Sequence, residues 1–207
     1  MPNPASTLVG EVEELRRYPV KSMLGEQLTV AEVVESGLLG DRAYALRDTS
    51  DGKIATAKNP RKWPNLFDYG AALTGAATAG EKLPPARITL PSGATITTEQ
   101  PDAAPILSAA LKREVRLEKI ERAGASNQET SEEYWLDMEG LEQRDTVTDF
   151  NLPEGTFFDT ATIHILTTAT LQRLHELYPE GPFFHPVPAG GNPADHGHGC
   201  GAFPACR

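Results

Sequence analysis

Short runs in which apolar and polar positions alternate dominate the first ~120 residues, and such runs are typical of β-strands. The clearest is ARITLPSGATITT, in which Ile88 and Leu90 precede a Pro-Ser-Gly turn and Ala94 and Ile96 follow it. This pattern predicts a β-hairpin. The strand candidates are residues 8–17, 27–34, 42–47, 53–57, 87–90, 94–98 and 114–120. Several short strands separated by turns favour a small barrel or a sandwich.

Two segments carry apolar residues at helical spacing. Residues 102–111, DAAPILSAAL, predict a short helix that Asp102 is able to cap. A second helix is predicted where four apolar residues recur before Pro179: Leu171, Leu174, Leu177 and Tyr178. Just before it, a short buried strand is predicted from three residues: Ile163, Ile165 and Leu166. The chain therefore predicts a mainly β fold with α-helices, of the α+β class.

Composition changes twice along the chain, and the changes predict its domain organisation. Residues 129–154 hold nine acidic residues against one basic residue, which is typical of a solvated linker, although Tyr134 and Trp135 indicate that part of it packs down. Residues 181–207 hold five prolines and six glycines and predict a disordered tail. We expect a β-rich domain at 1–121, an acidic connection at 122–156, a second unit beginning at 157–180, and the tail at 181–207.

Charge and hydropathy exclude several classes of function. The formal net charge of the chain is -10, which argues against nucleic-acid binding because phosphate contacts need a basic surface. No apolar run has the length of a membrane span, and the N-terminus lacks a signal-peptide pattern. We therefore expect a cytoplasmic protein without a membrane or nucleic-acid partner.

The segment YPVKSMLGE places a lysine and a serine, Lys21 and Ser22, directly after a proline that interrupts a strand. In GLLGDRAYALRD, a glycine turn leads into a strand that carries Arg42. An ammonium, a hydroxyl and a planar guanidinium together suit a phosphate or a polyanionic cofactor. The alternative is that Lys21 and Arg42 are exposed charges of the barrel.

Hydroxyl and metal-ligating side chains offer two further candidate sites. Thr167 and Thr168 fall where the predicted strand meets the second helix, and a helix N-terminus either is capped by threonine or holds an anion. The tail contains six residues that could ligate a metal: His185, Asp195, His196, His198, Cys200 and Cys206. Their spacing matches no structural zinc pattern, so no metal site is predicted. Asp41, Asp48 and Asp51 are interpreted as turn formers.

Four segments, taken in order, resemble the MOSC proteins that carry an N-terminal MOSC β-barrel domain, a group that includes the mitochondrial amidoxime reducing components. These segments are YPVKSMLGEQL, GLLGDRAYALRD, TAKNPRKWPNL and GTFFDTATIHILTTATLQRL. The resemblance covers roughly residues 8–180 and implies an N-terminal MOSC-type barrel followed by the beginning of an incomplete MOSC domain. It also implies a molybdenum cofactor (molybdopterin); pyridoxal phosphate binding is a further family-level association.

The resemblance assigns cofactor contacts to five residues of this chain: Lys21, Ser22, Arg42, Thr167 and Thr168. It implies reduction of small N-hydroxylated substrates, with an electron-transfer protein as partner. Neither Cys200 nor Cys206 matches the family's metal-ligating cysteine, and the family motif RFRPN is missing after the second helix. We therefore expect a truncation or a frameshift in the source gene. A non-catalytic cofactor or sulfur carrier, and an inactive fragment, stay open as alternatives to an enzyme.

Overall fold

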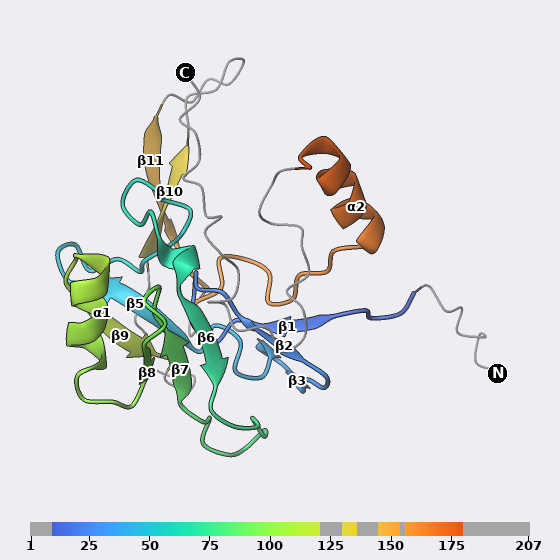
Figure 1. Ribbon diagram of the computed structural model, residues 1–207, viewed down its shortest axis with the longest axis horizontal. Helices are drawn as coiled ribbons and strands as arrows, with labels where there is room; N and C mark the ends of the chain where they lie inside the picture. The colour runs from blue at the N-terminus through green and yellow to red at the C-terminus, as the bar shows by residue number, and fades with distance from the viewer. Residues whose placement is uncertain (1–9, 121–129, 136–144, 154–155, 180–207) are drawn as a thin grey trace.

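The computed structural model describes residues 10–120, 130–135, 145–153 and 156–179. These residues form a mainly β fold with two α-helices, which confirms the predicted α+β class (Figure 1). The strands are β1 (Leu15–Arg17), β2 (Glu26–Leu28), β3 (Val33–Val34), β4 (Gly37–Leu38), β5 (Tyr44–Asp48), β6 (Gly70–Leu73), β7 (Ala86–Thr89), β8 (Thr95–Thr97), β9 (Val115–Lys119), β10 (Thr130–Trp135) and β11 (Thr146–Asn151). The helices are α1 (Ala103–Leu111) and α2 (Thr168–Leu177), and a 3-10 turn spans Leu66–Asp68.

The strands pair as short antiparallel ladders that isolated bridges join. β6, β7 and β8 form a three-stranded sheet, while β1–β2, β3–β4, β5–β9 and β10–β11 form pairs. The segment between β1 and β2 links two of these ladders, because Val20 bridges Tyr44 and Leu24 bridges Gly70, both in parallel. Within the described residues the ladders are assigned to five separate sheets, so the β-rich fold is confirmed and the barrel stays a prediction.

The β7–β8 hairpin and α1 lie where the sequence predicts them. Ile88 pairs with Ile96 across the hairpin, and both side chains are buried in the main core. Helix α1 packs against β9 and buries Leu107 completely. Asp102 occupies the N-cap position of α1, but its side chain makes no capping hydrogen bond, so that part of the prediction is wrong.

Three strand predictions were too long. Residues 10–14 are exposed, and β1 covers only the last three positions of the expected strand. The run at 27–34 breaks into β2 and β3, and in the run at 53–57 only Ile54 bridges other strands. Alternation over such short distances does not separate a paired strand from an extended loop, because pairing depends on which partner lies alongside.

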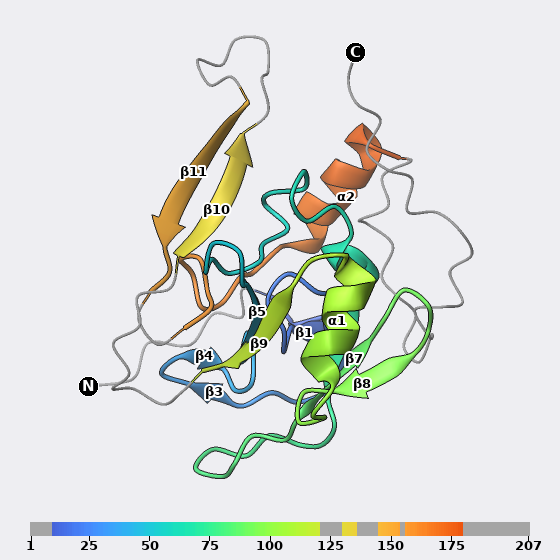
Figure 2. The ribbon, with the colours of Figure 1, turned by 90° about the vertical axis from the view of Figure 1, so that its left-hand side faces the viewer.

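The described part of the acidic segment forms a hairpin. β10 and β11 pair from Thr130↔Asn151 to Trp135↔Thr146, and a parallel bridge between Ser131 and Ile54 attaches the hairpin to the body. A second, smaller core lies at this junction, formed by Ala45, Ile54, Leu152 and Phe157. Figure 2 shows the hairpin and α2 rising from the same end of the body.

The expected buried strand before α2 is wrong. Residues 163–167 form no strand, and Ile165 and Leu166 are 86% and 66% exposed. Helix α2 forms as predicted, yet none of its residues is buried. An apolar run predicts a buried strand only if the chain supplies neighbours for it, and within the described residues none packs there. The expected division at 121 and 156 stays a prediction.

Candidate functional site

Lys21 is a buried cation rather than an exposed one. Pro19 is fully buried, and beyond it the Lys21 amide donates to the Tyr44 carbonyl at 2.9 Å, which draws the chain against β5. The Lys21 side chain is only 5% exposed. Its ammonium donates to the Phe157 carbonyl at 2.9 Å and pairs with the Asp159 carboxylate. Sequence position 21 is therefore joined to a segment well over a hundred residues later.

Lys58 is a further candidate residue that the motifs alone did not single out. Its ammonium lies 3.1 Å from Oδ2 of Asp159 and also pairs with Glu133 of β10. The same ammonium lies 5.0 Å from the centre of the Phe150 ring. One carboxylate is thus shared by two lysines. Lys58 lies in TAKNPRKWPNL, one of the four segments that carry the family resemblance, and this was the available signal.

The charges in this group perturb one another. Burial lowers the pKa of Lys21 and the attraction of Asp159 only partly offsets that effect, while Lys58 and Arg42 lower the pKa further. Burial by itself would raise the pKa of Asp159, but Lys21 and Lys58 outweigh burial and leave it below its usual value. Three cations thus lie close enough to act on one another.

Arg42 is held in place by both its backbone and its side chain. Its amide donates to the Tyr18 carbonyl at 2.8 Å, and its guanidinium lies over the rings of Tyr18 and Phe158, at 4.8 and 5.3 Å from their centres. The guanidinium also pairs with the buried carboxylate of Asp41. Asp41 accepts the Tyr18 amide at 2.6 Å, so this carboxylate fixes the turn while it compensates Arg42.

Ser22 and Arg42 both adopt positive φ, at 63° and 44°. Left-handed backbone is uncommon for residues other than glycine, and strain of this kind gathers at functional sites. The Ser22 hydroxyl accepts the amide of Ala57 at 3.1 Å, which ties it to the segment that carries Lys58. Gly25 is required nearby, because a Cβ at that position would lie 2.2 Å from the Arg17 carbonyl oxygen.

Thr167 and Thr168 are not joined to the lysines. Thr167 is the N-cap of α2, and its hydroxyl accepts the Thr170 amide at 3.1 Å, which confirms the predicted capping. Both threonines are exposed. The Thr167 hydroxyl bonds to the hydroxyl and the amide of Thr170, and the Thr167 carbonyl accepts the Leu171 amide within the same helix. The structure therefore brings together Lys21, Ser22 and Arg42 and leaves the two threonines on a separate helix.

We call Lys21, Arg42, Lys58, Asp41, Asp159 and Glu133 the Lys21 cluster. It contains three cations and three carboxylates from five separate parts of the chain. Its cations are of two kinds, ammonium and guanidinium, and Arg42 lies near enough to Lys21 to lower the pKa of that lysine. Both kinds of donor are common ligands of phosphate groups.

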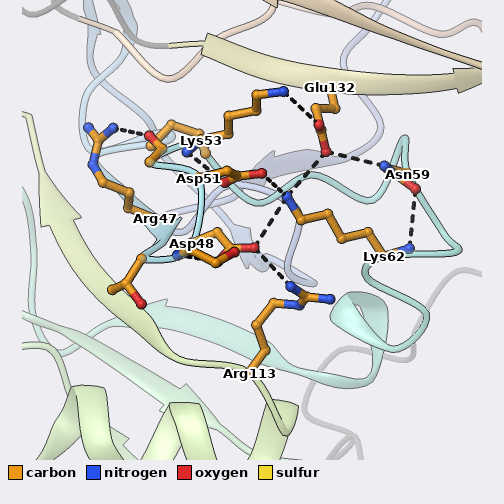
Figure 3. A network of polar contacts seen from close by, with 12 residues as sticks. Arg47, Asp48, Asp51, Lys53, Asn59, Lys62, Arg113 and Glu132 are labelled. Atoms are coloured by element: carbon orange, nitrogen blue, oxygen red, sulfur yellow. Dashed lines mark hydrogen bonds and ion pairs between the residues drawn. The ribbon is translucent and has the colours of Figure 1, made fainter.

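A second group of charges links β5 to the β10–β11 hairpin (Figure 3), and we call it the Asp48 network. Its members are Asp48, Asp51, Lys53, Lys62, Arg113 and Glu132. The Lys62 ammonium lies 3.2 Å from Asp48, 2.5 Å from Asp51 and 3.2 Å from Glu132. Arg113 contacts Asp48 at 3.1 Å, and Lys53 contacts Glu132 at 2.8 Å.

Asp48 and Asp51 also form turns, as predicted. Asp48 accepts both the amide and the hydroxyl of Ser50, at 2.9 and 2.6 Å, and Asp51 accepts the Lys53 amide at 3.0 Å. The Asp48 side chain is 1% exposed. Burial would raise the pKa of Asp48, but the bonds from Ser50 and Lys62 outweigh it and lower that pKa.

Within the described residues, no three His, Cys, Asp or Glu side chains are grouped so that they could hold a metal ion. No described helix has the length and apolar character needed to cross a membrane. The histidines and cysteines of the tail lie outside the described residues.

Comparison with known families gives one match. The family model described as MOSC N-terminal beta barrel domain matches residues 9–150. The match includes Lys21, Ser22, Arg42 and Lys58 and ends before Asp159. Neither the search of curated proteins nor the search of solved structures found a match.

Proposed function

Because the chain belongs to the family of proteins with a MOSC N-terminal β-barrel domain, we propose that it binds the phosphate of a molybdenum cofactor at the Lys21 cluster. By the resemblance stated above, the full reaction would be the reduction of small N-hydroxylated compounds. An electron-transfer protein would then be the partner that returns electrons to the site, and the cytoplasm would be the compartment.

The buried ammonium of Lys21 is the observation that carries this proposal. A lysine that is 5% exposed loses most of its hydration, which is unfavourable unless a function or a strong partner offsets it. The partner present here, Asp159, does not restore the pKa of Lys21 to its ordinary value. A buried cation that is incompletely compensated favours the binding of a further anion.

The donors present fit a phosphate group. An ammonium supplies a point charge and a guanidinium supplies a planar pair of donors, and both are common phosphate ligands. Lys21 and Lys58 would contact phosphate oxygens, while Arg42 would orient the group from the side of Tyr18 and Phe158. Ser22 would hold the turn through its bond to the Ala57 amide.

A bound molybdenum cofactor would supply two-electron redox chemistry, and the chain would bind it and orient it. The three cations would neutralise the phosphate, and the rings of Tyr18 and Phe158 would shield the Arg42 guanidinium from water. Thr167 and Thr168 remain candidate contacts that would require α2 to approach the cluster.

The test is the molybdenum and pterin content of the protein purified from a host that makes the cofactor. Pterin fluorescence reports the organic part and metal analysis reports the molybdenum. We expect Lys21→Ala and Arg42→Ala to lose most of the pterin while they keep the fold. Lys82→Ala is the matched control, because Lys82 is 77% exposed and pairs with Glu99 away from the cluster.

Each outcome separates the possible functions. Molybdenum and pterin together with turnover of an amidoxime would support the reductase. Pterin without turnover would support a carrier. A wild-type protein that holds neither would overturn the proposal, as would equal pterin in the wild type and both variants. Pyridoxal phosphate carries a similar phosphate group and is a second ligand to titrate.

A further inference from the structure

Two lysines from distant segments converge on the Asp159 carboxylate. Lys21 reaches it from the turn after β1, and Lys58 reaches it from the segment before β6. A carboxylate between two ammonium groups occupies the place that an anionic ligand group would take. We propose that Asp159 is an internal competitor for this place, and that a phosphate-type anion binds only when the Asp159 side chain leaves it. The inference rests on the function proposed above and adds regulation of the same site.

Asp159 compensates the buried Lys21 and Asp41 compensates Arg42, but the two carboxylates are held differently. Asp41 is 4% exposed and accepts the Tyr18 amide at 2.6 Å, so its departure would break the turn. The Asp159 side chain is 27% exposed. In the described part of the chain, its polar contacts are those with Lys21 and Lys58. Only Asp159 can leave without breaking the backbone structure.

The backbone around Asp159 favours this motion of the side chain. Phe157 and Phe158, which precede it, are buried, whereas Thr160 and Ala161, which follow it, are exposed. The segment is thus anchored on one side of Asp159 and open to solvent on the other. A change of side-chain rotamer carries the carboxylate from the lysines to water without moving the anchor.

Both lysines keep a partner when Asp159 leaves. Lys21 retains the Phe157 carbonyl at 2.9 Å, and Lys58 retains Glu133. An ammonium has three donors, so each lysine still offers hydrogen bonds to an incoming anion. A phosphate group carries more charge and more acceptor oxygens than one carboxylate, and it therefore displaces Asp159.

An internal competitor lowers the apparent affinity, because the ligand binds only to the fraction of molecules in which the place is open. Replacing Asp159 by asparagine keeps the size of the side chain and removes its charge. We expect Asp159→Asn to bind inorganic pyrophosphate about tenfold more tightly than the wild type. Lys58→Gln removes one of the two ammonium groups and should weaken binding by about the same factor.

The measurement is calorimetric titration of the full chain with inorganic pyrophosphate at fixed ionic strength. Glu99→Gln is the control, since it changes the net charge by the same amount but lies in a separate exposed pair with Lys82. Tighter binding by Asp159→Asn, with Glu99→Gln equal to the wild type, supports the proposal. Equal gains in both variants would reveal a general charge effect and would overturn it.

The inference and the proposed function fail separately. If Asp159→Asn binds pyrophosphate no better than the wild type while the wild type carries pterin, the proposed competition by Asp159 is wrong and the proposed function is supported. If Asp159→Asn gains affinity as expected while the wild type carries no pterin, the proposed competition by Asp159 is supported and the proposed function is wrong. Absence of pyrophosphate binding in both proteins overturns the competitor whatever the pterin content is.

Discussion

The Lys21 cluster and the Asp48 network are built from the same kinds of side chain but differ in the exposure of their central carboxylates. Asp48 is 1% exposed and is held by Ser50, Lys62 and Arg113. Asp159 is 27% exposed and contacts two lysines. Each carboxylate joins segments that lie far apart in the sequence. A carboxylate that is buried and holds backbone groups is a structural part of the fold, whereas a partly exposed carboxylate that contacts only side chains can be replaced by another anion. The number of ion pairs does not separate these two cases.

The pKa directions of the two central lysines support this distinction. Burial would lower the pKa of Lys62, but its bonds to Asp51, Asp48 and Glu132 outweigh burial and raise it. Burial lowers the pKa of Lys21 and its partner fails to compensate. The Asp48 network therefore favours the charged form of Lys62, whereas the Lys21 cluster leaves Lys21 in an unfavourable environment that a bound anion would improve.

The largest expected effect is the loss of Asp48. Asp48→Ala would leave Arg113 and the Ser50 amide without their acceptor and would remove one of three carboxylates from Lys62. Breaking a buried charge pair from one side typically lowers the free energy of unfolding by about 3 kcal/mol. Urea denaturation followed by circular dichroism measures it. Asp149→Asn is the control, because Asp149 pairs with Lys53 but is 54% exposed. An equally large loss of unfolding free energy in the control would contradict the role assigned to burial.

The next effect is a difference in alkaline behaviour. A raised lysine pKa contributes stability that is present below the unfolded value of 10.5 and is lost as the pH rises through the folded pKa. A lowered lysine pKa acts in the opposite direction. Between the folded pKa and 10.5 the unfolded chain binds more protons than the folded chain, so the free energy of unfolding rises with pH in that window. Lys62→Met should reduce the alkaline loss, and Lys21→Met should remove the alkaline gain.

Urea denaturation at several pH values from about 8 to about 11 tests both variants against the wild type. The comparison concerns the slope of the unfolding free energy with pH, so a constant offset between the proteins does not affect it. Slopes that change in the same direction in both variants would contradict the assignment of opposite pKa shifts.

The smallest expected effect is on stability when Asp159 is neutralised. Asp159→Asn should lower the free energy of unfolding by less than Asp48→Ala does, because the Asp159 carboxylate is partly exposed and Lys21 keeps the Phe157 carbonyl as an acceptor. Urea denaturation beside Asp48→Ala makes the contrast direct. A loss for Asp159→Asn equal to that for Asp48→Ala would place Asp159 among the structural carboxylates.

The sequence predicted the elements whose signals are local. The β7–β8 hairpin carries its turn between two alternating runs, and α1 and α2 carry their apolar spacing, so each was predicted with small boundary errors. The β10–β11 hairpin was missed because its acidic residues are typical of a solvated linker. In the structure Glu132 and Glu133 pair with lysines that lie more than seventy positions earlier in the sequence. Strand β6, with the sequence GAAL, was missed because it has no clear alternation.

The candidate site was predicted in part. Lys21, Ser22 and Arg42 were identified from their motifs, and the structure brings their segments together. Lys58 and Asp159 lie inside two of the segments that carry the family resemblance, but they were not singled out, because their importance arises from a contact between them that the sequence does not show. The burial of Lys21 could not be predicted from its motif either, because it depends on the distant segment around Phe157 that covers it.

The bond between Lys21 and the Phe157 carbonyl spans a sequence separation of 136 residues, and this has a kinetic consequence. Closing a long loop is entropically unfavourable, and distant contacts form late when the segments between them can fold first. The ladders between β5 and β9 need no residue beyond Lys119. During synthesis the β-rich body would therefore fold before the chain around Phe157 leaves the ribosome, and the lysine would be enclosed in one of the last steps.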